Sequence, residues 1–264
     1  MKRTVSILIA AFTLLSVQAQ VTVSTGSPKL LGLAKQSLHT TMSLGNEHYF
    51  VFRTKENALD LFTVVSSDEK GNIRDVKPLK IDNGVFNNGY YITGVYAVGG
   101  KMYAAVENPD KNAGLNRLTL RLIENGEVSK KDIPVGAMEF KKLMNQGNWF
   151  LSVTPDQNHL AVVGQMPPEK DEPNQYKFFF LDASLQVTQK GNLGFPEDGK
   201  RVHFNKFHAS DKGDFYLIEN EFDKTYQYPK VYKASISDPK GTVIAVQPSD
   251  PSKKIMSYTS TVNE

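Results

Sequence analysis

The chain has 264 residues, no cysteine, 31 Lys and Arg and 28 Asp and Glu, so its formal net charge is +3. Lys2 and Arg3 belong to a leader that we expect to be removed, which leaves 29 basic against 28 acidic residues and no basic run. This balance does not indicate nucleic acid or an anionic membrane surface as a partner. A chain of this length buries enough surface to be stable without disulfides.

Residues 1–19 have the pattern of a secretory signal peptide. Lys2 and Arg3 form its positive start, residues 5–15 its apolar core and residues 17–19 a small-residue cleavage site. The alternative is a membrane anchor, but the core has only about a dozen apolar residues, whereas about 20 are needed to span a bilayer. We therefore expect an exported protein, either periplasmic or extracellular at the surface of a Gram-negative bacterium, with no integral membrane segment after cleavage.

Two series of turns recur along the rest of the chain with a common spacing of about 56 residues. The first series comprises residues 45–47, 98–100, 155–158 and 211–213. The second follows each member about 25 residues later, at residues 68–72, 124–126, 182–184 and 238–241. Each turn stands between runs rich in β-branched and aromatic residues, as in a β-hairpin. Two hairpins in each repeat predict four strands in each repeat.

These repeats predict an all-β fold, namely a β-propeller or partial propeller of about four four-stranded blades. The blades occupy about residues 38–83, 84–137, 138–197 and 198–250. In the second unit Leu118, Leu120 and Leu122 alternate with polar residues, which is the period of a strand with one buried face. Residues 178–181 are apolar on both faces, as expected for a strand between neighbouring blades.

Two segments outside the repeats concern the closure of the propeller. Residues 20–37 begin with the β-prone residues 21–24, which could add a strand to the last blade. Residues 253–264 have two interpretations: a strand that closes a four-bladed ring, or the start of a fifth blade in a longer propeller. We prefer the second, because four-bladed rings are less common and a sheet edge needs a partner.

One hairpin resembles a known family. Residues 152–162, SVTPDQNHLAV, resemble the hairpin of WD40-like and TolB-like propeller repeats, as in secreted propeller proteins of Bacteroidetes-type bacteria. Residues 208–218 are a looser match, and the first two units lack the Pro-Asp pair. Such repeats occur in peptidase propellers, binding scaffolds and envelope proteins, so the resemblance implies a fold and not an activity.

The sequence contains no complete catalytic or metal-binding motif. It has no G-x-S-x-G nucleophile elbow, and its five histidines form none of the usual zinc patterns. Residues 108–114 are rich in Asn and Asp but lack the order of a calcium loop, and the same residue types build ordinary turns. We therefore predict no cofactor and no metal, and we favour a non-catalytic protein over an enzyme.

The loops between the second and third strands of each unit are expected to emerge together on one face of the propeller. They are residues 55–58, 108–114, 166–175 and 220–227. From these loops we select a polar binding face with one aromatic contact, consisting of Asp110, Lys111, Glu169, Asp171, Glu172, Asp223, Lys224 and Tyr226. The alternative is that these charges only solvate long loops.

The leading prediction is thus an exported, non-catalytic binding module that holds a protein, peptide or glycan ligand on the loop-lined face of a propeller. The alternative is the propeller part of a hydrolase. It takes two forms: a serine-peptidase-like protein whose catalytic domain is absent from these residues, or a glycan-active propeller enzyme whose acidic residues meet at the central channel.

Overall fold

The computed structural model describes residues 37–56, 59–81, 89–143, 145–167, 174–195, 204–223, 226–248, 255 and 260. The expected signal peptide lies outside the described residues, as do residues 20–36 and most of residues 253–264. None of the described residues belongs to a helix that is long and apolar enough to cross a membrane.

Four antiparallel sheets follow one another along the chain, each with its strands in sequence order. The first contains β1 (Ser37–Leu44), β2 (Glu47–Glu56), β3 (Leu59–Ser67) and β4 (Ile73–Pro78). The third contains β10 (Asn148–Val153), β11 (Leu160–Gln165), β12 (Tyr176–Leu181) and β13 (Val187–Leu193). The fourth contains β14 (Phe204–Ala209), β15 (Asp214–Asp223), β16 (Tyr226–Ser235) and β17 (Thr242–Ala245).

The second sheet differs in its outer edge. It contains β5 (Tyr91–Val98), β6 (Lys101–Asp110), β7 (Leu115–Glu124), β8 (Glu127–Val128) and β9 (Ile133–Glu139). Both β8 and β9 pair with β7, on consecutive stretches of that strand. The outermost strand is therefore split in two, and Asp132 at the break accepts hydrogen bonds from Arg121 at 2.6 Å and Thr119 at 3.3 Å.

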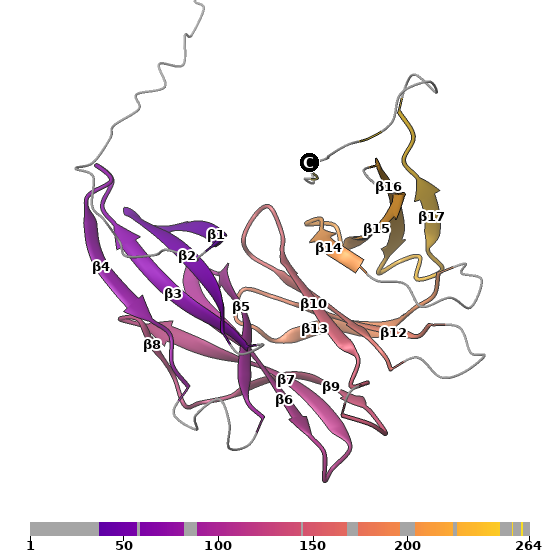
Figure 1. Ribbon diagram of the computed structural model, residues 1–264, viewed down its shortest axis with the longest axis horizontal. Helices are drawn as coiled ribbons and strands as arrows, with labels where there is room; N and C mark the ends of the chain where they lie inside the picture. Colours follow the sequence, from indigo (N-terminus) through magenta and orange to yellow (C-terminus); the bar gives the residue numbers. More distant parts are fainter. Residues whose placement is uncertain are drawn as a thin grey trace, which may run out of the picture.

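The four sheets are arranged along an open arc, from the indigo first sheet to the yellow end of the fourth (Figure 1). The first strands of the sheets, β1, β5, β10 and β14, lie on the inner side of this arc, and β10 contacts both β5 and β14. Within the described part of the chain, β1 and β14 are not paired with each other. This arrangement, with no helix among the described residues, confirms the predicted all-β propeller-type fold.

Hydrophobic clusters fill the spaces between successive sheets, because each sheet presents apolar side chains on the face toward its neighbour. Between the first and second sheets the buried residues include Val51, Phe62, Val95, Ala104 and Val106. Between the second and third they include Leu118, Leu120, Met138, Trp149 and Leu160. Between the third and fourth the cluster is mainly aromatic and includes Phe178, Phe180, Phe207, Phe215 and Tyr232.

The Pro-Asp turn that marks the repeat also joins its two neighbours. The backbone N–H of Gly99, in the β5–β6 turn, donates to the carbonyl of Gln157 at 2.8 Å. The backbone N–H of Asp156 donates to the carboxylate of Asp211, in the β14–β15 turn, at 3.0 Å. Equivalent turns of three successive sheets are therefore linked by hydrogen bonds, which fixes how the sheets are rotated relative to one another.

Candidate functional site

A cavity of about 310 Å³ lies where the first strands of the second, third and fourth sheets begin. Tyr91, Asn148 and Phe204 are the first residues of β5, β10 and β14. The described residues that line it are Tyr91, Glu107, Gln146, Gly147, Asn148, Trp149, Phe150 and Phe204.

This cavity lies at the end of the sheets from which the second-to-third strand loops leave. Glu107 is close to the end of β6 and is the register partner of Tyr91, the first residue of β5. Asn148, the first residue of β10, is likewise the partner of Gln165, the last residue of β11. The cavity and the loop face predicted from the sequence therefore share one end of the molecule.

Glu107 is the central polar group of the cavity. Its side chain is buried, and its Oε2 accepts hydrogen bonds from the Tyr91 hydroxyl and from Asn116 Nδ2, both at 3.1 Å. Gln146 Nε2 donates to the Tyr91 hydroxyl at 2.8 Å, which orients the phenol toward Glu107. Both protein hydrogen bonds reach the same carboxyl oxygen, so Oε1 has no hydrogen-bond donor among the described residues.

Burial also changes the proton affinity of this group. Desolvation raises the pKa of Glu107, and the hydrogen bonds from Asn116 and Tyr91 oppose that rise because they favour the charged form. Burial and the nearby Glu107 carboxylate together raise the pKa of Tyr91 and of Tyr96. The site therefore contains a carboxyl group that takes up a proton more readily than an exposed one.

Aromatic side chains form much of the remaining wall. Phe150 and Phe204 meet edge to face, with ring centroids 5.7 Å apart. Trp149, which precedes Phe150 in the sequence, is buried. The indole Nε1 of Trp149 is buried without a hydrogen-bond partner in the described part of the chain. No Lys, Arg or His is among the described residues that line the cavity. The cavity thus combines one carboxyl group, amide groups and aromatic surface.

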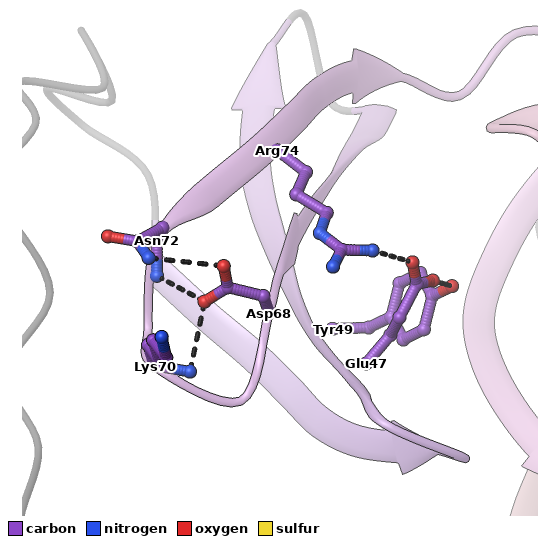
Figure 2. Close-up of polar contacts among 6 residues, drawn as sticks. All are labelled: Glu47, Tyr49, Asp68, Lys70, Asn72 and Arg74. Carbon is purple, nitrogen blue, oxygen red and sulfur yellow. Dashed lines mark hydrogen bonds and ion pairs between the residues drawn. The ribbon is translucent and has the colours of Figure 1, made fainter.

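A larger groove of about 520 Å³ lies at the opposite end of the sheets, between the first and second sheets. Figure 2 shows that Glu47 lies between Arg74 and Tyr49, and the Arg74 guanidinium is 2.8 Å from its Oε1. The hydrogen bond to Glu47 raises the pKa of Tyr49 to about 12. Lys77 in turn contacts Asp75 at 2.8 Å. These charged groups already pair with one another, so we take the smaller cavity as the candidate site.

Figure 2 also shows how the predicted turn at residues 68–72 is held. The carboxylate of Asp68 accepts hydrogen bonds from the backbone N–H groups of Lys70 and Asn72, both at 2.9 Å, and from Asn72 Nδ2 at 3.1 Å. These hydrogen bonds lower the pKa of Asp68. Asp68 is therefore a turn-forming residue, as the sequence pattern indicates.

Asp110 has the same role in the β6–β7 turn. Its carboxylate accepts hydrogen bonds from the backbone N–H groups of Asn112 and Ala113, both at 3.0 Å, and from Arg117 at 3.1 Å. Lys111 is exposed in the same turn. The Asp110 oxygens that a calcium ion would need are engaged by this turn and by Arg117, and the described residues contain no group of three His, Asp or Glu that could hold a metal.

The other predicted site residues are only partly described. Asp223 ends β15 and pairs through its backbone with Tyr226, the first residue of β16, so the two lie at the expected loop. Glu169, Asp171, Glu172 and Lys224 lie outside the described residues. A contribution of these six side chains to binding stays a prediction.

The sequence analysis missed the residues of the cavity. A signal was present, because Glu107 follows the apolar run Met102 to Val106 inside one strand, where a charged side chain is unexpected. Trp149, the single tryptophan of the chain, also lines the cavity. What could not be read was that Tyr91, Gln146 and Phe204, from three different repeats, meet around Glu107.

No protein-family model and no curated protein matches the sequence. Among solved structures, the chain is similar to an α-L-arabinanase from Penicillium chrysogenum complexed with arabinobiose, with 9% identity and a TM-score of 0.51 over 82% of this chain and 68% of that one. At this identity the similarity supports the propeller fold alone.

Two further solved structures show weaker similarity. One is the β-propeller domain of the trilobed protease from Pyrococcus furiosus, with 14% identity and a TM-score of 0.38, and this chain covers 57% of it. The other is the polysaccharide lyase Uly1, with 13% identity and a TM-score of 0.47, and this chain covers 49% of it. The chain thus spans about half the length of these two proteins. Its relation to the WD40-like and TolB-like repeats stays a prediction from the sequence.

Proposed function

We propose that the protein is an exported, non-catalytic binding module that holds a protein, peptide or glycan ligand on the loop-lined face of its propeller. The observation that supports this proposal is Glu107, a buried carboxyl group that lines a cavity at the same end of the sheets and has one oxygen without a donor among the described residues. Recognition sites commonly have this form, in which a few fixed polar groups stand within a largely aromatic wall.

The polar groups of the cavity are arranged to hold a ligand. Tyr91 and Asn116 fix the carboxyl group of Glu107, and Gln146 fixes Tyr91, so Oε1, which has no donor among the described residues, is also held in one position. A hydrolase of glycans would normally need a second carboxyl group within about 5 to 10 Å. Glu107 is the one carboxyl group among the described lining residues, and this favours binding over such chemistry.

The loops complete this proposal. Glu169, Asp171, Glu172 and Lys224 belong to the β11–β12 and β15–β16 connections, and Asp223 and Tyr226 are the strand residues next to the second of these. We assign these residues, together with Asp110 and Lys111 of the β6–β7 turn, to selection of the ligand. Loops on a repeat scaffold are where such selection usually takes place.

A second candidate function is favoured by the same carboxyl group. A buried glutamic acid with a raised pKa is suited to donate a proton to a leaving group. If a second acid joins it, the protein is a glycan-active propeller enzyme. The fold is shared with an arabinanase, although at 9% identity this similarity does not extend to activity.

The test measures binding of the full chain without its expected leader to arrays of defined peptides and oligosaccharides. We expect the wild type to retain a reproducible set of ligands and Glu107→Ala to lose it. Arg74→Gln, in the paired groove at the opposite end, is the matched control and should retain the same set. Equal retention by Glu107→Ala would overturn the assignment of the cavity.

Two further measurements separate the parts of the proposal. A variant with Asp171, Glu172, Asp223 and Lys224 replaced by Ala should lose most of the captured ligand with little change in melting temperature, and unchanged capture would remove the loops from the site. Mass spectrometry of the captured ligand after prolonged incubation should find it intact. A cleaved product that Glu107→Gln does not form would establish the enzyme instead.

A further inference from the structure

The geometry of the cavity points to an organic ammonium group as the part of the ligand that enters it, and we assign this group to the lysine side chain of a peptide. This inference rests on the binding function proposed above. It selects a peptide over a glycan among the possible ligands. Three features of the described residues support it: the charge of the lining, its aromatic rings and the depth of Glu107.

The negative charge of Glu107 favours a cation as the ligand. Glu107 is the one carboxyl group among the described lining residues, its Oε1 has no donor among the described residues, and no described cationic residue lines the cavity. A buried carboxylate without a counter-ion is unfavourable, which is why burial raises the pKa of Glu107 in the free protein. An ammonium group would supply the missing positive charge and a hydrogen bond to Oε1.

The aromatic rings favour the same ligand. Tyr91, Trp149, Phe150 and Phe204 are four of the eight described lining residues. Ring faces attract an organic cation that lies within about 6 Å of their centres. A sugar also stacks on aromatic rings, and its hydroxyl groups can donate to a carboxylate, but it does not supply the positive charge that a buried carboxylate lacks.

The depth of the carboxyl group favours a lysine. Glu107 is on β6, behind Tyr91 of the inner strand, and only 6% of its surface is exposed. A volume of about 310 Å³ is at the lower limit of ligand pockets, which favours one side chain over an oligosaccharide. Lysine carries a compact charge at the end of a flexible four-carbon stem, whereas the guanidinium of arginine is broad and planar.

Isothermal titration of the full chain without its leader tests the inference with four defined probes. Nα-acetyl-lysine methylamide should bind, and Nα-acetyl-norleucine methylamide, which has the same four-carbon stem but no ammonium group, should bind at least about 30-fold more weakly. Alaninamide tests the free α-amine as the source of the ammonium group, and arabinobiose tests a sugar. Binding of alaninamide alone would support an ammonium ligand but overturn its assignment to a lysine side chain. Binding of arabinobiose alone would overturn the whole inference.

Two variants assign the effect to Glu107. Glu107→Gln keeps the shape and should lose the preference for the lysine probe over the norleucine probe, whereas Arg74→Gln should keep it. Circular dichroism and the melting temperature show whether each variant is folded. An unchanged preference in folded Glu107→Gln would overturn the inference.

The pH dependence gives an independent readout. Tyr91 and Tyr96 are the described titratable groups next to Glu107, and both have a raised pKa, so Glu107 is the group that titrates in the acidic range. Only its ionised form attracts an ammonium group, so affinity for the lysine probe should rise as pH rises above the ordinary carboxyl range. Affinity that does not change with pH would contradict the inference. Failure of all amine probes, with Glu107-dependent capture on the arrays, would leave the binding function intact.

Discussion

Tyr91 and Glu107 face each other across the β5–β6 pair, and the Tyr91 hydroxyl donates a hydrogen bond to Glu107 Oε2 at 3.1 Å. Tyr91 is the first residue of β5, the innermost strand of the second sheet. This hydrogen bond therefore holds the Glu107 carboxyl group on β6, one strand further out. Asn116 on the next strand donates to the same oxygen, and no described residue donates to the second oxygen. The position of the Glu107 carboxyl group is therefore a consequence of strand register in one sheet.

Replacing Glu107 should change how stability depends on pH. Burial raises the pKa of Glu107 above its ordinary value of 4.5, so the folded protein binds this proton more tightly than the unfolded chain. Its contribution to the free energy of unfolding is therefore complete below about pH 4.5 and is lost as pH rises through the folded pKa. The stability of the wild type relative to Glu107→Gln should fall over that range in urea denaturation.

Asp182 provides the opposite case for the same measurement. Hydrogen bonds from Ser184 and Gln186 lower the pKa of Asp182 below 3.8. Its contribution is present above pH 3.8 and is lost as pH falls through the folded pKa. The stability of the wild type relative to Asp182→Asn should thus fall toward acid. If the stability of the wild type relative to each variant changed in the same direction with pH, the direction of the pKa shift assigned to Glu107 or to Asp182 would be wrong.

Gly164 on β11 is required for the packing of Trp149. A Cβ at this position would lie 2.8 Å from Cζ3 of Trp149 and 2.9 Å from the sulfur of Met138. We expect Gly164→Ala to lower the free energy of unfolding by about 1 to 3 kcal/mol, which is typical of overpacking. Gly194→Ala is the control, because no atom lies within 4 Å of its added Cβ. A similar loss in both variants, measured by urea denaturation, would contradict the packing argument.

The sequence was informative where contacts are local. The turn at residues 155–158 joins β10 and β11 as its Pro-Asp pattern predicts, because the turn residues themselves set the hairpin. The split of the outer strand into β8 and β9 was not predicted, since it depends on Asp132 reaching Arg121 on β7. The cavity was not predicted either, because its residues come from three repeats and meet only through the packing of whole sheets.

The ion pair at that split should contribute more than an exposed one. Arg121 Nε is 2.6 Å from Asp132 Oδ1, and the Arg121 side chain is only 9% exposed. Because Asp132 itself is 40% exposed, solvent screens part of the interaction. We expect Asp132→Asn to lower the free energy of unfolding by about 1 to 2 kcal/mol.

Asp60→Asn is the matched control for this ion pair. Arg53 Nε is 3.7 Å from Asp60 Oδ1, and both side chains are a third or more exposed. Its replacement should change the free energy of unfolding by less than about 0.5 kcal/mol. If urea denaturation finds equal losses for the two variants, the burial of Arg121 adds nothing to the strength of its ion pair.

Phe215 should hold the third and fourth sheets together. It is fully buried on β15, and its ring centroid lies 5.3 Å from that of Phe178 on β12 and 6.2 Å from that of Phe207 on β14. Phe215→Ala removes a large buried ring and should lower the free energy of unfolding by about 3 to 5 kcal/mol. Ile244→Ala on β17, where the side chain is 51% exposed, should cost less than about 0.5 kcal/mol.

The same pair of variants shows whether the sheets unfold together. Trp149, the single tryptophan, is buried between the second and third sheets, away from the mutated ring. In a repeat array each unit is stabilised by its neighbours, so loss of Phe215 should shift the Trp149 fluorescence transition as far as the circular dichroism transition. If the fluorescence midpoint stays at its wild-type value while the circular dichroism midpoint falls, the fourth sheet unfolds on its own and the candidate cavity opens at Phe204 before the other sheets unfold.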